Sequence, residues 1–148
     1  MEFKSIDEIV AYIESVIPSV LNECSYDMQE IMIDEIMKQI YKHHVPKEYD
    51  RTGQLLDTPQ LVDISNNSVT MEFLDNGGWK SVYEPYEHIN AFEAWEEGKV
   101  WGEGTSSNKR IFKYRPATNI HEASLNKCEN EIPNKFKSYL QNMGIPIE

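Results

Sequence analysis

Residues 61–74 have the sequence LVDISNNSVTMEFL, and this stretch decides the fold class. Apolar residues alternate with polar ones on both sides of Asn66 and Asn67, a pair typical of a turn. Alternation with a period of two is typical of strands that bury one face. The stretch therefore predicts a β-hairpin, with two antiparallel strands joined at the asparagines.

The residues before the hairpin follow a helical period instead. Apolar residues recur at spacings of three and four over 6–17 and again over about 20–44. Pro18 is expected to separate these two helices and Pro46 to end the second, because proline lacks a backbone N–H donor. Ser5, three residues ahead of a glutamate, forms a capping box at the start of the first helix.

A last helix is expected at the end of the chain. Asn119, together with Glu122, is expected to cap its start, and Pro133 to kink or split it. Gly144 followed by Pro146 is typical of a helix stop. The apolar face of this helix is expected to consist of Leu125, Cys128, Ile132, Phe136, Leu140 and Met143.

The region between the hairpin and the last helix is less regular. Its patterns predict a third strand at 79–83, a short helix at 89–97, a long glycine-rich loop at 98–108 and a strand at 109–115. The whole is therefore expected to be one α+β domain, 1–148. Its antiparallel β-sheet, made of the hairpin 61–74 and further strands, would be packed by long N-terminal helices and a C-terminal helix.

Charge is the strongest compositional signal. Asp and Glu number 25 against 14 Lys and Arg, which gives a net charge of -11, so most of the surface would repel nucleic acid. The distribution is uneven, since 1–37 carry nine carboxylates and the one cation Lys4, whereas 109–115 carry four cations and no acid. Such asymmetry indicates contacts between subunits or with a partner, or else a solvated face. The absence of a long apolar run and of a signal-peptide pattern at the start predicts a cytosolic protein.

Few residues suggest chemistry. Cys24 and Cys128 are expected to be small buried apolar residues, and the four histidines, His43, His44, His88 and His121, show no metal-binding spacing. Glu97 and Lys99 have the acid-x-lysine spacing of some metal-dependent nucleases, a pattern that also arises by chance in a chain this acidic. We therefore expect no catalytic residue, no metal and no cofactor, and hence no enzyme.

The stretch at 41–57, YKHHVPKEYDRTGQLLD, is the most informative motif. It predicts a helix exit followed by a fixed corner: proline ends the helix, an aromatic residue anchors the turn, and a glycine is free to take positive φ. The residues that form this corner motif are Tyr41, Pro46, Tyr49, Arg51, Thr52, Gly53 and Leu55. A well-packed turn with no further role would also explain them.

The corner motif resembles that of the tail-completion proteins (head–tail joining or neck proteins) of long-tailed bacteriophages and prophages. In that family a similar pattern follows a long helix and precedes a hairpin, a variable loop and a C-terminal helix. The close match covers 41–57, and the remainder matches in the order of its elements.

The resemblance implies a structural virion protein that is assembled in the host cytoplasm and resides in the tail or neck. Copies would form a ring, a hexamer in the family, between the connector or stopper ring and the tail tube or tail terminator. DNA would only pass through the channel, no membrane would be involved, and no catalytic residue is carried over.

Two other functions remain open from the sequence. A small acidic regulatory or immunity-type protein that binds a basic protein partner fits the net charge equally well. A metal-dependent nuclease that uses Glu97 and Lys99 is the third alternative.

The contacts with neighbouring subunits are expected in the loop 98–108 and the basic strand 109–115. Tryptophan is frequent among interface hot spots, and clustered cations on an acidic chain can pair with the acidic N-terminal segment of another copy. Protection of an exposed edge strand by the cations is the alternative explanation. The candidate interface residues are Trp95, Trp101, Lys109, Arg110, Lys113 and Arg115.

Overall fold

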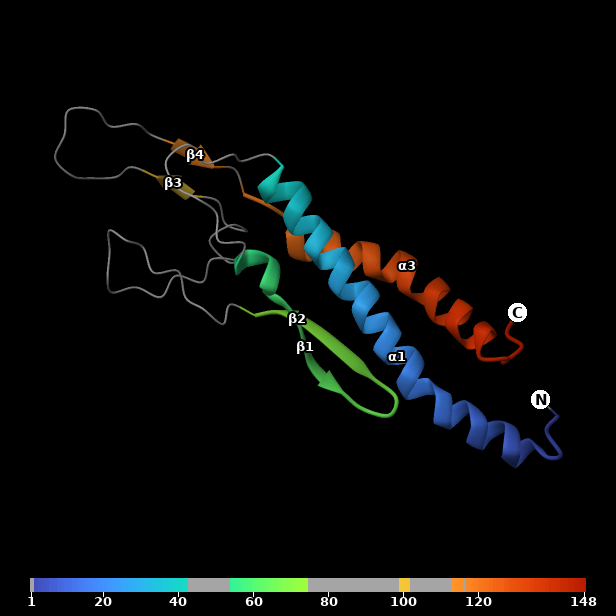
Figure 1. The fold of residues 1–148 in the computed structure, drawn as a ribbon. Helices are drawn as coiled ribbons and strands as arrows, with labels where there is room; N and C mark the ends of the chain where they lie inside the picture. Colours follow the sequence, from blue (N-terminus) through green and yellow to red (C-terminus); the bar gives the residue numbers. More distant parts are fainter. Residues whose placement is uncertain (1, 43–53, 75–98, 102–112, 116) are drawn as a thin grey trace, which may run out of the picture.

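The computed structural model describes residues 2–42, 54–74, 99–101, 113–115 and 117–148 (Figure 1). Two long helices lie side by side, and a β-hairpin packs along the first of them (Figure 1). The predicted α+β class is confirmed. The elements are α1 (Ile6–Ile36), a π-helix (Met37–Tyr41), a 3-10 turn (Gln54–Asp57), β1 (Pro59–Ile64), β2 (Val69–Phe73), β3 (Lys99–Trp101), β4 (Lys113–Arg115) and α3 (Ile120–Asn142).

The start of α1 follows the predicted capping box. The backbone N–H of Glu8 donates to Ser5 Oγ at 3.2 Å, and Glu8 Oε2 accepts from the backbone N–H of Lys4 at 2.7 Å. The Glu8 N–H, which the first turn of the helix leaves without a partner, is thereby satisfied, and Glu8 binds the backbone one residue before the N-cap Ser5.

The expected break at Pro18 is wrong, because α1 runs without interruption from Ile6 to Ile36. Val16 and Val20, which flank the proline, both pack into the apolar cluster between α1 and α3. A proline inside a helix costs roughly 3 kcal/mol. Burial of a single aliphatic side chain contributes about 1.5–3 kcal/mol, so the packing on both sides of Pro18 offsets that cost.

Helix α3 also continues through its proline, so the expected split at Pro133 is wrong. Its buried face differs in part from the expected one: Leu140 is buried, but Leu125 and Met143 are exposed. Ile120 and Ser124 are buried instead.

The helix stop at Gly144 is confirmed and forms a Schellman motif. Gly144 has φ 83°, its N–H donates to the Gln141 carbonyl at 3.0 Å, and the N–H of Ile145 donates to the Leu140 carbonyl at 3.1 Å. Leu140 and Ile145 then meet in one buried cluster with Val20 and Cys24, which ties the end of α3 to α1.

We predict that Gly144→Ala lowers the free energy of unfolding by about 1 kcal/mol, because a residue with a Cβ atom is strained at positive φ. A Cβ atom at this position would meet nothing within 4 Å, so the loss isolates backbone strain. Urea denaturation measures it. Since asparagine tolerates this conformation better, Gly144→Asn should lose less, and an equal loss in both variants would contradict the explanation.

The predicted hairpin is confirmed. Strands β1 and β2 pair antiparallel, with Leu61 opposite Met71 and Ile64 opposite Val69, and a register shift lies between Leu61 and Asp63. This bulge keeps Leu61 and Ile64 on one face although they are three residues apart. The hairpin lies along α1, where Gln29 Nε2 donates to the Pro59 carbonyl at 2.9 Å.

Strands β3 and β4 pair antiparallel in a second sheet. The prediction of a loop over 98–108 is therefore wrong for Lys99–Trp101, which form a strand. Valine and tryptophan are frequent in strands, and β4 provides the pairing partner. The strand expected at 109–115 is confirmed for Lys113–Arg115. Within the described residues the strands form two separate sheets rather than one. The expected strand at 79–83 and helix at 89–97 lie outside the described residues.

Candidate interaction site

The two described ends of the corner motif come together. Leu55, only 3% exposed, packs with Ile36, Ile40 and Ile120, and Tyr41 packs against the same cluster. Thr58 Oγ1 donates to the Leu55 carbonyl at 2.7 Å and fixes the turn that leads into the hairpin. This supports a structural role for the motif's ends. Its remaining members lie outside the described residues: Pro46, Tyr49, Arg51, Thr52 and Gly53.

Three of the six candidate interface residues lie on the β3–β4 ribbon, the pair of strands Lys99–Trp101 and Lys113–Arg115. Trp101 is on β3, and Lys113 and Arg115 are on β4. Lys99 is opposite Arg115, and Trp101 is opposite Lys113, so all four positions share one face of the ribbon. Trp95, Lys109 and Arg110 lie outside the described residues.

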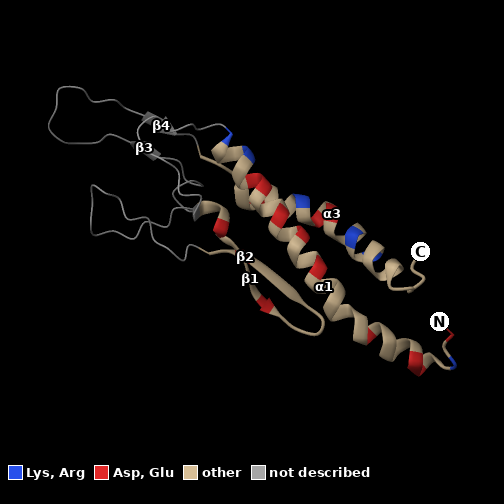
Figure 2. Cartoon of the chain, viewed as in Figure 1, with Lys and Arg blue, Asp and Glu red and all other residues tan. Residues whose placement is uncertain are grey.

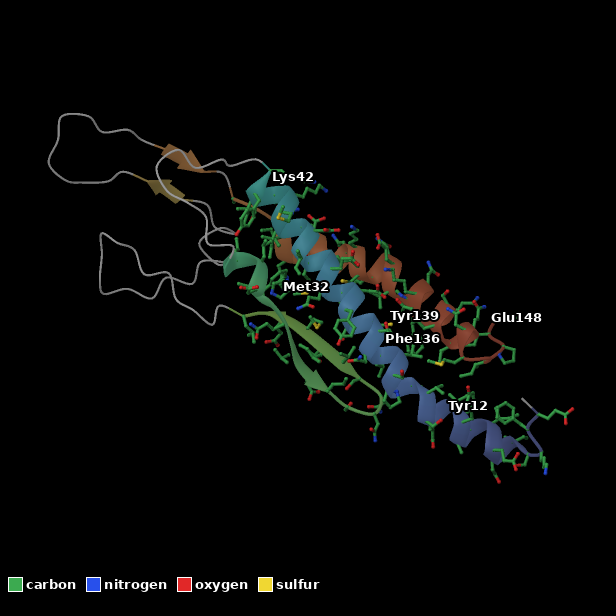
Figure 3. All side chains as sticks on the ribbon, in the orientation of Figure 1. Tyr12, Met32, Lys42, Phe136, Tyr139 and Glu148 are labelled. Carbon is green, nitrogen blue, oxygen red and sulfur yellow. The ribbon has the colours of Figure 1, made fainter. Side chains whose placement is uncertain are left out.

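A polar contact between the two helices was not anticipated from the sequence. Asp27 of α1 accepts hydrogen bonds from Lys135 Nζ at 2.9 Å and from Tyr139 OH at 2.5 Å, both on α3. Figure 3 labels Tyr139 and Phe136, which pack against the apolar cluster of α1 and α3. The signal available was the spacing of Lys135 and Tyr139, four residues apart and therefore on one helix face. We call these three residues the polar clamp.

The polar clamp shifts the pKa values of its donors. The hydrogen bond to Asp27, aided by burial, raises the pKa of Tyr139 from its ordinary 10.0 to about 12. The same hydrogen bond raises the pKa of Lys135. Both shifts favour the protonated donors, which are the forms that can donate to the Asp27 carboxylate.

We predict an alkaline loss of stability that depends on Tyr139. Because the pKa of Tyr139 is higher in the folded state, its hydrogen bond stabilises the fold fully below pH 10 and is lost as the pH rises to about 12. Tyr139→Phe should be less stable than the wild type at pH 7 and should lose less stability above pH 10. Urea midpoints measured from pH 7 to pH 12 check this, with the exposed Tyr26→Phe as control. An unchanged pH slope in Tyr139→Phe would contradict the prediction.

A second polar link connects the π-helix that follows α1 to the start of α3. Gln39 Nε2 donates to the buried Glu35 Oε2 at 2.9 Å, and Gln39 Oε1 accepts from the backbone N–H of Asn119 at 3.0 Å. The side chain of Asn119 makes no capping hydrogen bond, so the expected cap by Asn119 and Glu122 is wrong. The glutamine from the other helix binds the backbone at this point instead.

The thiols are suited to packing. Cys24 is buried as expected, whereas Cys128 is only half-buried. Burial, followed by the negative charge of Asp27, raises the pKa of Cys24, and burial raises that of Cys128. Both thiols therefore remain protonated at neutral pH.

Among the residues that the structure describes, no three His, Cys, Asp or Glu side chains are grouped as metal ligands, and Glu97 lies outside them.

The first turns of α1 expose large apolar side chains. Ile6 is 78% exposed, Val10 47% and Ile9 39%. From Tyr12 onward the helix packs against α3, and Tyr12 OH donates to the Met143 carbonyl at 2.6 Å (Figure 3). We call Ile6–Ala11 the overhang, because α3 ends at Asn142 and Tyr12 already contacts Met143, the next residue of the chain.

A second group of exposed apolar side chains lies on β1, at Leu61, Val62 and Ile64. Acidic residues are spread along α1, which carries no Lys or Arg between Ile6 and Ile36 (Figure 2).

No helix within the described ranges is long and apolar enough to cross a membrane. Exposed apolar groups beside charged ones are typical of surfaces that bind other proteins.

Comparison with known proteins yields one family. The family model YomN matches residues 5–142, which include both long helices and both sheets. No curated protein and no solved structure shows significant similarity to the chain.

Proposed function

The chain belongs to the YomN family, whose name is that of a phage- or prophage-associated protein, and we propose that it is a structural protein of the virion. In this proposal, copies form a ring at the head–tail interface and join the connector to the tail. The assignment to the neck rests on the corner motif at 41–57 and its resemblance to tail-completion proteins. The chain acts by binding other proteins and has no enzymatic role.

The observation that carries a protein-binding function is the exposure of apolar side chains at two places. The overhang and β1 each present three large aliphatic residues to solvent. Full burial of an exposed aliphatic side chain contributes about 1.5–3 kcal/mol, and these residues, most of them 39–48% exposed, each contribute part of that when a partner covers them. The partners proposed are further copies in a hexameric ring, the connector or stopper ring, and the tail tube or tail terminator.

The acidity of α1 fits the same proposal. A ring around a DNA channel must let the double helix slide, and carboxylates along its wall prevent the phosphates from binding. DNA is therefore proposed as a passing molecule rather than a ligand.

Deletion of the gene from an inducible phage or prophage genome tests the proposed function. Electron microscopy of the induced lysate should show DNA-filled heads and separate tails, and expression of the chain from a plasmid should restore joined particles. Complete, infectious particles from the deletion strain would overturn the proposal.

A second function is favoured by one observation, the run of acidic residues along α1, which carries no Lys or Arg from Ile6 to Ile36 (Figure 2). An acidic regulatory or immunity-type protein would use exposed carboxylates of this helix to neutralise a basic protein partner. Such a protein would stay with the soluble fraction of the lysate, whereas a neck protein should co-sediment with purified particles, so its fractionation distinguishes the two functions.

A further inference from the structure

Pro18 lies inside α1 and divides the helix into a short first part, residues 6–17, and a longer second part. Because proline has no backbone N–H, the helical hydrogen bond to the Glu14 carbonyl cannot form at this point. A helix of about three turns is marginally stable on its own in water. We call residues 6–17 the arm, and its helix depends on contacts with other parts of the chain.

The second part of α1 is held along its length. Asp27 binds α3 through the polar clamp, Gln29 binds the Pro59 carbonyl of the hairpin, and Ile36 is completely buried. The overhang, by contrast, is exposed and packs against neither buried cluster of the described chain. Only the later residues of the arm pack against one of these clusters.

The contacts that hold the arm involve the last residues of the chain, 143–148, which we call the tail. Tyr12 OH donates to the Met143 carbonyl at 2.6 Å. Ile13 packs against the apolar cluster that contains Ile145. The tail therefore acts as a latch, because it fixes the arm beside the end of α3.

Opening at Pro18 removes an energetic cost. If the arm unfolds or swings away, Pro18 becomes the first residue of the helix that remains, a position that proline favours. Inside a helix, proline shifts the equilibrium against the helical state by roughly a hundredfold. Pro18 is the one proline within α1, so the relief is available at this point of the helix.

The apolar residues of the arm continue the buried face of α1. Ile6, Ile9, Ile13 and Val16 precede the buried Val20 at spacings of three and four, so all five share one helix face. This face is packed from Ile13 onward, whereas Ile6 is 78% exposed. An open arm therefore presents a longer apolar strip than the overhang alone.

We propose that the arm is a conformational device, hinged at Pro18 and latched by the tail, which opens to uncover the apolar face that the closed chain covers from Ile13 onward. The closed position limits the apolar surface that a free chain presents. The use of the open arm in assembly rests on the proposed function, because a neighbouring subunit would then cover the uncovered face. The hinge itself is a property of the single chain.

Hydrogen exchange of the purified full-length chain, followed for each amide by NMR, tests the hinge. The amides of 10–17 should share a common protection factor, at least about tenfold below that of 21–36, with a step at Pro18. Pro18→Ala should raise the protection of the arm at least about tenfold, because alanine has no such cost inside a helix. Tyr12→Phe should lower it roughly three- to tenfold, the effect of one hydrogen bond, and leave 21–36 unchanged.

Pro133→Ala is the matched control, since it also replaces a proline inside a long helix, and it should leave the protection of the arm unchanged. Circular dichroism of each variant verifies that the helices are intact. Protection factors that fall smoothly toward Ile6, without a step at Pro18, would show ordinary fraying of a helix end and overturn the hinge. An arm that Pro18→Ala leaves unchanged would do the same, and one that Tyr12→Phe leaves unchanged would overturn the latch.

The hinge and the proposed function can fail separately. If the deletion strain gives joined particles although the purified chain shows the step at Pro18, the proposed function is wrong and the hinge remains. If the deletion strain gives separate heads and tails but 10–17 and 21–36 share one protection factor, the hinge is wrong and the proposed function remains.

Discussion

Leu55→Ala should lower the free energy of unfolding by about 2–5 kcal/mol, the usual cost of deleting a buried leucine side chain. Leu55 is 3% exposed and packs with Ile36, Ile40 and Ile120, which join α1 to α3. Its loss leaves a cavity where the corner motif returns to the core. Urea denaturation followed by circular dichroism measures the change.

Leu125→Ala is the matched control. Leu125 is 51% exposed on α3, and truncation of an exposed side chain usually changes stability by no more than about 0.5 kcal/mol. Equal losses in the two variants would show that Leu55 is not part of the core, and the structural role of the corner motif would then be wrong.

Asp27→Ala should produce the second largest effect, a loss of about 1–3 kcal/mol, because two charge-assisted hydrogen bonds between the helices disappear together. The Asp27 side chain is 13% exposed and accepts from both Lys135 and Tyr139. Asp27→Asn keeps an acceptor oxygen and should lose less. Thermal or urea denaturation at neutral pH and low salt gives the values.

The control for this prediction is Asp34→Ala, an exposed aspartate on the same helix. It removes the same charge without removing a contact between helices. If Asp27→Ala and Asp34→Ala were equally stable, the loss would reflect net charge alone and the polar clamp would not hold α1 to α3.

The elements that could be predicted from the sequence depend on neighbours in the chain. The hairpin rests on alternation over 61–74, the start of α1 on Ser5 and Glu8, and the end of α3 on Gly144. In each case the deciding contacts lie within a few residues, so the local pattern contains the necessary information.

The failures depend on contacts between distant segments. Pro18 was expected to separate two helices and Pro133 to kink or split one, but α1 and α3 each run through their proline, and the apolar cluster between them packs around both. Asn119 was expected to cap α3, but Gln39, 80 residues earlier, binds its backbone. The polar clamp likewise joins residues more than 100 positions apart, a pairing that no local pattern contains.

The candidate interaction site was predicted in part. The sequence identified the cations of the β4 region and the acidic N-terminal segment, but it did not show that β3 pairs with β4 or that Lys99 shares their face. The helical apolar period over 6–17 includes Ile6, Ile9 and Val10, which are exposed in the structure. An apolar stripe on a helix is the same in sequence whether its partner lies in the same chain or in another one.

The location of the chain in the particle tests the neck assignment most directly. An epitope tag inserted between Asn66 and Asn67 would sit in the exposed loop that joins β1 to β2, away from both buried clusters. Immunogold electron microscopy of purified particles carrying the tagged chain should then place the gold at the junction of head and tail. Gold at the distal tail tip, along the tail or absent from intact particles would contradict a neck protein.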